Sequence, residues 1–410
     1  MGILASNSSR KTYYILIVIT LTAAIMANLV LVKLLCLLIA SIIYFAGRYE
    51  KVCFDGQRLW REGLTSYFER IFSRQSTSIQ IEDVELVSTE AIRSRRLRRV
   101  KYCYNVKITA RMIAITIPFK IGNSDPSLLR EVFSRLEETS LDPRSCELKE
   151  YLQQVEPASS KYKDSFNADY CGIPTQKLCR IAGDLKLEGA LQEAYRCFFL
   201  AYKREPHNPR LLYEMARLLY SIGSYHPRLL MRAAACLRLA AIFAKSDSKL
   251  LERIGETCFE KGDFEKASTY FTKALELEPT LFRSNIGLAE IALREGKIAR
   301  VVHYYSNAAR ASSSPQQRFA LREAEYYNKL YSDDTYFRLE FDRIQKLGLA
   351  KSTRDFCVTL LLLSWVAALL GGFFLPQINQ LAWMGIISSV SIWTASSIMM
   401  LRYSQRHVQK

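Results

Sequence analysis

The sequence predicts a mainly α-helical protein, with an array of repeated helix pairs, a small α+β domain before it, and two helical hairpins in a membrane. Three observations lead to this fold class. A helix-pair pattern recurs between residues 175 and 349, two long apolar blocks lie near the two ends, and the range 48–140 alternates apolar and polar residues as strands do. The 410 residues are enough for two or three domains.

The first apolar block covers residues 12–47 and contains few charged side chains. As one helix it would be about 50 Å long, whereas a bilayer crossing needs only about 20 residues. We therefore expect a transmembrane hairpin that turns near Asn28, with one long tilted helix as the alternative. Basic residues flank the block, among them Lys11 and Arg48, and they favour the cytoplasmic side for both of its ends.

The second apolar block covers residues 355–402 and divides into two halves around the polar turn Pro376–Gln380. Each half matches the thickness of a bilayer, and both flanks are again basic, so a second transmembrane hairpin is expected. A buried hairpin in a soluble protein is the alternative. The two hairpins together predict an integral membrane protein with four spans and cytoplasmic soluble domains, typical of a bacterial inner membrane.

The range 48–140 reads as short strands followed by one helix. Asp55-Gly56 favours a tight turn in a first hairpin, and Asp125 with Pro126 predicts the start of an amphipathic helix. Further strands are expected at Thr77–Val87, Val100–Thr109 and Met112–Phe119. This order of elements after an apolar hairpin resembles the bacterial pleckstrin-homology-like membrane proteins over about 100 residues, although no sharp motif supports it.

A basic run lies between two of these expected strands. The net charge of the whole chain is +17, which favours an anionic neighbour. We expect the run to be a loop that faces anionic phospholipid, where each basic group contributes about 1 kcal/mol. A solvated basic turn is an equal alternative, and nucleic acid is the disfavoured partner because no binding motif is present. The basic residues are Arg93, Arg95, Arg96, Arg98, Arg99 and Lys101.

The repeats carry the strongest signal in the chain. Residues 175–208, 248–281 and 282–315 place small residues, an aromatic residue and a closing proline at matched positions, with Gly255, Ala267 and Phe271 in the second of these. Small residues are needed where two helices cross closely, and proline ends the second helix. Residues 209–247 need about five extra residues near His226, residues 316–349 are degenerate as a terminal cap would be, and residues 141–174 read as a linker.

This pattern resembles the tetratricopeptide-repeat (TPR) family over about 175 residues. The resemblance implies a curved solenoid whose first helices line a concave face that binds a segment of another protein. Arg210 and Arg217 could pair with an acidic or carboxyl-terminal partner. The residues expected on this face are Lys186, Arg210, Tyr213, Arg217, Tyr220, Glu252, Glu256, Arg283, Glu290 and Arg294.

No motif of an enzyme accompanies these features. The sequence has no glycine-rich phosphate loop, no nucleophile elbow and no His/Cys pair at metal-ligand spacing, so we expect no catalytic residue, metal or cofactor. The sequence therefore predicts a membrane-anchored TPR adaptor that docks another protein, such as a subunit of a membrane complex. A lipid-sensing module that works through the basic run, with structural repeats, is the alternative.

The topology can be tested by labelling single cysteines placed at the two expected turns. With Asn28→Cys and Asn379→Cys in otherwise cysteine-free chains, a membrane-impermeant thiol reagent should label both from outside the cell, because the basic flanks keep both ends of each hairpin inside. Labelling of either position from the inside only would contradict that hairpin.

Overall fold

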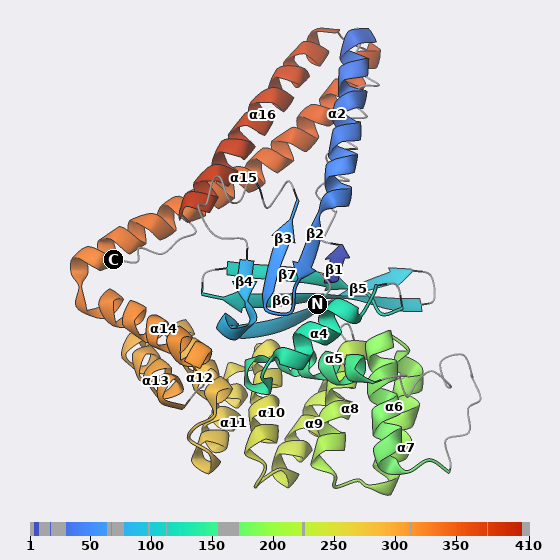
Figure 1. Cartoon of the computed structure of the whole chain (residues 1–410), viewed down its shortest axis with the longest axis vertical. Coiled ribbons are helices and arrows are strands. Elements are labelled where there is room, and N and C mark those ends of the chain that lie inside the picture. The colour runs from blue at the N-terminus through green and yellow to red at the C-terminus, as the bar shows by residue number, and fades with distance from the viewer. Residues whose placement is uncertain are drawn as a thin grey trace. The chain divides into compact units, whose positions relative to one another are not determined.

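The computed structural model describes residues 4–7, 17, 30–63, 67, 78–96, 99–111, 113–122, 124–154, 172–223, 226–311, 314–374 and 376–403. Its contacts divide the chain into two compact units. The first contains residues 1–6, 54–58 and 80–328, and the second contains residues 7–53, 59–79 and 329–410. Most described residues are helical, and a smaller part forms strands, as the sequence predicts (Figure 1).

Helix pairs fill most of the first unit and follow one another in chain order (Figure 1). Within each pair the two helices pack closely, and each pair packs on the next. A further helix, α14, follows the last pair. The helices are α6 (Thr175–Glu188), α7 (Leu191–Arg204), α8 (Pro209–Ile222), α9 (Pro227–Phe243), α10 (Ser248–Glu260), α11 (Phe264–Leu277), α12 (Phe282–Arg294), α13 (Ile298–Ala311) and α14 (Ser314–Ser332).

Small residues occupy the helix crossings, as the repeat pattern requires. Ala194, Ala267 and Ala308 are fully buried in three different pairs. The ring of Phe271 fills the space that two glycines leave, because a Cβ on Gly255 would lie 2.7 Å from Phe271 Cδ1 and one on Gly287 would lie 2.5 Å from Cε2. The core therefore depends on these two residues having no side chain.

The extra residues near His226 lengthen both the turn and the second helix. Four residues separate α8 from α9, and α9 has 17 residues where α7 has 14. The expected end of the solenoid at residue 349 is wrong. A single helix of 41 residues, α15 (Asp334–Phe374), runs without a break from the degenerate repeat into the second apolar block.

The first unit also contains a three-stranded antiparallel sheet in the order β5–β6–β7. Its strands are β5 (Leu86–Arg96), β6 (Arg99–Ala110) and β7 (Ile113–Phe119). The strand expected at Thr77–Val87 is wrong, because β4 (Ser78–Gln80) is followed by the 3₁₀ helix η1 (Ile81–Asp83) and β5 begins only at Leu86. The basic run is likewise not an isolated loop, since both strands extend into it and the register pairs Arg96 with Arg99.

The range 141–174, expected to be a linker, contains a helix. Helix α4 (Ser127–Arg135) follows the sheet, and its start is held by Asp125 Oδ1, which accepts a hydrogen bond from the Ser127 amide at 2.9 Å. The 3₁₀ helix η2 (Glu138–Ser140) leads into α5 (Pro143–Gln153), where Asp142 caps the first turn by accepting from the Ser145 amide. Residues 155–171 lie outside the described part of the chain.

The second unit contains most of the residues of three further strands. Strands β2 (Lys51–Phe54) and β3 (Arg58–Glu62) form the expected hairpin, with Gly56 at a φ of 96° in the turn, and β4 lies next to β3. Strand β1 is Leu4–Asn7. The range 48–140 thus holds strands of two sheets rather than one. Glu50 is buried and lies 3.8 Å from Arg61.

The long helices of the second unit carry the apolar blocks. Helix α2 (Val30–Tyr49) covers the second half of the first block, and the expected turn at Asn28 lies outside the described residues. Helices α15 and α16 (Pro376–Tyr403) pack along each other, and the expected polar turn is in fact the first turn of α16. Within the described residues one segment, Leu381–Met400, is long and apolar enough to cross a membrane, so the four spans stay a prediction.

The packing of Phe271 predicts the effect of adding one methyl group. Gly287→Ala should lower the free energy of unfolding by about 1–3 kcal/mol, because glycines on both sides prevent the ring from moving aside. Gly183→Ala is the matched control, since nothing lies within 4 Å of its added Cβ and alanine favours a helix. Thermal unfolding of the purified chain in detergent measures both, and equal melting temperatures would contradict the prediction.

Candidate functional site

The candidate site is the first-helix face, which we define as the face of the repeats formed by α6, α8, α10, α12 and α14. In the first unit this face carries other parts of the same chain. Helix α5 contacts α6, and η2 and the turn before β5 contact the later helices. In repeat proteins the concave surface binds partners. The contacts of this face with the same chain therefore indicate which groups it can pair with.

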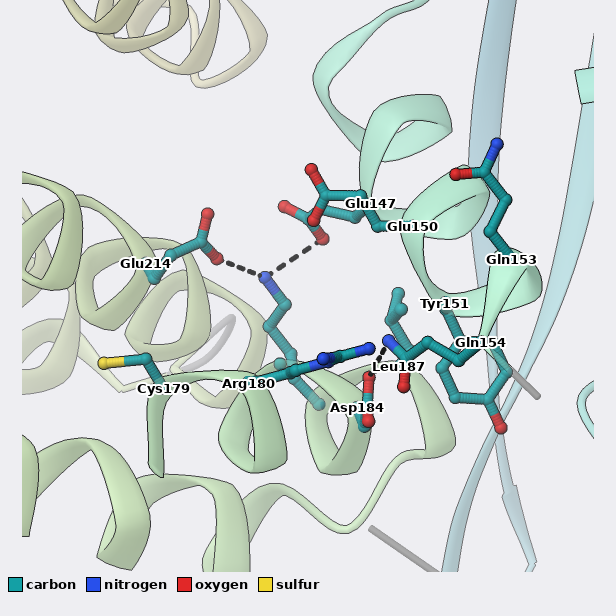
Figure 2. A pocket seen from close by; sticks show the side chains of 12 residues that line it. Glu147, Glu150, Tyr151, Gln153, Gln154, Cys179, Arg180, Asp184, Leu187 and Glu214 are labelled. Atoms are coloured by element: carbon teal, nitrogen blue, oxygen red, sulfur yellow. Dashed lines mark hydrogen bonds and ion pairs between the residues drawn. The ribbon is translucent and has the colours of Figure 1, made fainter. Parts of the chain in front are cut away.

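Glu147 of α5 is the centre of an ion-pair network on this face. Its Oε2 lies 3.0 Å from Lys186 Nζ of α6, and its Oε1 pairs with the guanidinium of Arg217 of α8. Lys186 Nζ also lies 2.8 Å from Glu214 Oε2 (Figure 2). Both cationic side chains are about nine-tenths buried. One carboxylate therefore connects α5 to two repeats.

Burial changes the acid–base properties of this network. Desolvation lowers the pKa of Arg217 to about 10, although the nearby carboxylate of Glu260 opposes the shift. Desolvation likewise raises the pKa of Tyr213, whose ring lies under the Arg217 guanidinium at 5.7 Å. The Tyr213 hydroxyl accepts a hydrogen bond from Thr257 Oγ1. Tyr213 is thus part of the interior, and the largely buried guanidinium of Arg217 is already paired with Glu147.

A second group of polar contacts lies on the later repeats. Arg283 of α12 donates to Glu256 at 2.7 Å and to the carbonyl of Ser140 in η2 at 3.2 Å. Arg322 of α14 forms a two-pronged contact with the buried carboxylate of Glu85, both at 3.0 Å. Cations of the first helices therefore hold the segments on both sides of the sheet.

Two carboxylates of α10 lie close together in this second group. Glu252 accepts hydrogen bonds from the amide and the hydroxyl of Ser284, at 2.8 and 3.0 Å. Burial and the neighbouring Glu256 raise the pKa of Glu252 to about 7, against the effect of these hydrogen bonds. Because Glu252 and Glu256 are both buried and repel each other when charged, ionisation of both at once is disfavoured.

Beside the Glu147 network lies a cleft of about 480 Å³, which we call the α5–α6 cleft (Figure 2). It is mostly acidic, and Gln154 of α5 donates to Asp184 across it at 3.4 Å. Although Glu150 is exposed by area, the surrounding protein and Glu214 raise its pKa, while Arg253 opposes the shift. The lining residues are Glu147, Glu150, Tyr151, Gln153, Gln154, Cys179, Arg180, Gly183, Asp184, Lys186, Leu187 and Glu214.

Other residues expected on the concave face lie in more open places. Arg210 is largely exposed and lies 3.5 Å from Asp247. Arg294 lies over the rings of Phe259 and Phe264, Tyr220 is half-buried, and Glu290 is exposed. The structure thus joins Lys186, Arg217 and Arg283 to the chain's own groups and leaves Arg210 and Glu290 apart from them.

Little of the basic run can be placed at the level of side chains. Arg93 is exposed and donates to the carbonyl of Ser221 at 3.4 Å. The side chains of Arg95, Arg96, Arg99 and Lys101 are not described, and Arg98 lies outside the described residues. Their role at a lipid surface stays a prediction.

The sequence reading missed α5 and with it Glu147 and Glu150. The signal was present, because Asp142 followed by Pro143 is the same capping pair that predicted α4. The partner of Glu147 could not be found this way, since its cations come from α6 and α8, about 40 to 70 residues further along the chain.

Comparison with known proteins supports the class of fold. A family model described as a tetratricopeptide repeat matches residues 248–281, which form α10 and α11. No curated protein matches the chain. Residues 248–281 are therefore similar to a tetratricopeptide repeat, and arrays of such repeats commonly act as scaffolds for protein interactions.

Among solved structures, the chain has a limited likeness to MamA. "MamA MSR-1 C2" is 15% identical, with a TM-score of 0.30 over 37% of this chain and 82% of that one. "Crystal structure of MamA protein" is 15% identical, with a TM-score of 0.29 over 39% of this chain and 95% of that one. "Crystal structure of MamA" is 10% identical, with a TM-score of 0.28 over 53% and 96%.

The Glu147 network predicts a large loss of stability when its charge is removed. Glu147→Gln leaves two nearly buried cations with fewer counter-charges and should lower the free energy of unfolding by about 3 kcal/mol. Glu131→Gln on the surface of α4 is the control, because exposed pairs contribute less than about 1 kcal/mol. Chemical denaturation followed by circular dichroism compares the two variants. A loss as small as that of the control would show that α5 is not held by this carboxylate.

Proposed function

We propose that this protein is a membrane-anchored TPR scaffold that docks another protein in the α5–α6 cleft and so helps to assemble or localise a membrane complex. The repeats support the scaffold part of this proposal. The apolar segment Leu381–Met400 and the basic flanks of both apolar blocks support the anchor.

The chain's own helix α5 is a guide to how a partner would bind. It is held on α6 and α8 by one carboxylate between two cations, which is recognition of a helix by ion pairs. A partner segment beside α5 would use the same face. Such a surface needs no new pocket, because the α5–α6 cleft is already present and partly open.

The carboxylate of Glu150 determines the charge of the partner segment that this cleft would favour. Its carboxylate makes no hydrogen bond or ion pair within the described residues, yet it lies in a cleft that raises its pKa. The charges of Lys186 are already met by Glu147 and Glu214. The cleft thus offers unpaired negative charge, and a lysine- or arginine-bearing segment would satisfy it. This differs from the acidic partner expected for Arg217, because Glu147 already occupies that position.

The test uses a photo-crosslinking amino acid at Gln153, which lines the cleft, in native membranes. In this background Glu150→Lys should reduce the amount of crosslinked partner about tenfold, because a repulsive contact that weakens binding by about 1.4 kcal/mol lowers the affinity tenfold. Glu276→Lys on the exposed surface of α11 is the matched control and should leave the crosslink intact. Equal crosslinking in all three chains would refute docking in this cleft.

One observation favours lipid sensing as a second function. The β5–β6 register places Arg96 opposite Arg99 at the end of the hairpin, and like charges in that position destabilise a hairpin unless an anion offsets them. The crosslinking experiment therefore includes a chain with Arg95, Arg96, Arg98 and Arg99 changed to Glu. If that chain keeps the crosslink, the scaffold proposal stands. If it alone loses cellular function and vesicle binding, lipid sensing is the better account.

A further inference from the structure

A second, smaller cleft lies in the first unit between the sheet, α5, α8 and α10, and we call it the basic cleft. Its volume is about 220 Å³. Strands β5 and β6 contribute Arg93 and Tyr102, and α5 contributes Arg144. The repeats contribute Arg217 from α8 and, after α10, Lys261.

The charges that line the basic cleft do not balance. Its cations are Arg93, Arg144, Lys186, Arg217 and Lys261, and its carboxylates are Glu147 and Glu260. Both carboxylates are already in use, because Glu147 pairs with Lys186 and Arg217, and Glu260 lies 3.0 Å from Arg144. The lining therefore carries more cations than carboxylates, with Lys186 also paired to Glu214 and with Arg93 and Lys261 exposed to solvent. Cations gathered in one cleft attract an anion.

Lys261 lines the cleft and is exposed to solvent by surface area. Its ammonium lies over the ring of Tyr220 at 5.1 Å and forms no ion pair within the described part of the chain. Desolvation lowers its pKa, and Arg144 and Arg217 lower it further, while Glu260 opposes them. The three cations repel one another across the cleft.

Tyr102 adds a second unsatisfied group. Its hydroxyl is buried and has no hydrogen-bond partner among the residues that the structure describes. The hydroxyl lies in the field of Arg93, Arg144 and Lys186, and burial raises its pKa, so it stays a hydrogen-bond donor at neutral pH. A buried donor without an acceptor costs about 1–3 kcal/mol, so a water molecule or an ion that accepts from it is favoured at this position.

We propose that the basic cleft binds a small phosphate-bearing anion, with Lys261 and the Tyr102 hydroxyl as its direct ligands and Arg144 and Arg217 as neighbouring charges. The free groups of the cleft are donors, and phosphate offers several acceptor oxygens together with up to two negative charges. The volume is sufficient for one phosphate with a small organic group. The basic cleft borders the α5–α6 cleft at Glu147, Lys186 and Leu187, but the proposed ligands Lys261 and Tyr102 line the basic cleft alone, so this proposal does not depend on the docking of a partner.

The proposal is tested on the full chain in detergent with inorganic phosphate and glycerol 3-phosphate as probes. Both should raise the melting temperature more than sodium chloride at equal ionic strength, because a ligand that binds only the folded state stabilises it. Calorimetric titration should give a single site. No difference from chloride would overturn the proposal.

Variants locate the site. Lys261→Met should weaken phosphate binding at least tenfold, whereas Lys249→Met on the exposed surface of α10 should not change it. Tyr102→Phe should weaken binding about threefold to tenfold while leaving the ligand-free chain as stable or more stable, since it removes only an unpaired hydroxyl. Weaker binding together with unchanged or higher stability is not expected of a residue that only supports the fold. The Tyr102→Phe variant therefore tests the proposal even if Lys261→Met fails to fold.

The results also separate a soluble ligand from a lipid. Binding of glycerol 3-phosphate without binding to vesicles that contain 20% phosphatidic acid assigns the site to a soluble phosphate. Loss of vesicle binding with Lys261→Met assigns it to the headgroup. Phosphate binding that is unchanged by both Lys261→Met and Tyr102→Phe would overturn the proposal, because the anion would then bind elsewhere.

Discussion

The fold of the first unit depends on one carboxylate that meets two cations from different repeats. Glu147 lies between Lys186 and Arg217, and all three side chains are largely removed from solvent. Charges of this kind are tolerated in the interior only when they are paired, so the three groups must come together for any one of them to be buried. This requirement fixes α5 on α6 and α8, and through the bridge between Val87 and Leu141 it also positions the sheet.

As a consequence, the first-helix face of the repeats is already covered in part by other segments of the same chain. Ion pairs of Arg283 and Arg322 with the segments around the sheet continue the same arrangement along the later repeats. Two clefts stay open beside these contacts, the mostly acidic α5–α6 cleft and the basic cleft, and Glu147 of α5 lines both. The two clefts have opposite charge because Glu147, Lys186 and Arg217 compensate one another at the boundary between them.

Local patterns predicted the helices and their crossings well. Ala267, Phe271 and Gly255 occupy the buried positions that the repeat pattern assigns to them, and the Asp55-Gly56 turn and the β7 strand lie where alternation placed them. The failures have particular causes. Residues Ile81–Asp83 of the expected strand form a 3₁₀ helix instead, and α15 continues through Gly348 and residue 349 as one helix into the apolar block. The first half of the first apolar block is outside the described residues, so its hairpin stays a prediction.

The sequence by itself determined the class of the protein, because helix periodicity, small crossing residues and closing prolines act over short distances along the chain. It also determined which residues line the first helices of the repeats. Only the tertiary structure decided what those residues contact. Arg217 is equally suited to a partner's carboxylate and to Glu147, and spacing alone cannot distinguish the two, because the pairing depends on how α5 folds back from 70 residues away. Electrostatic pairs form through space, and their partners are therefore set by the packing of whole elements.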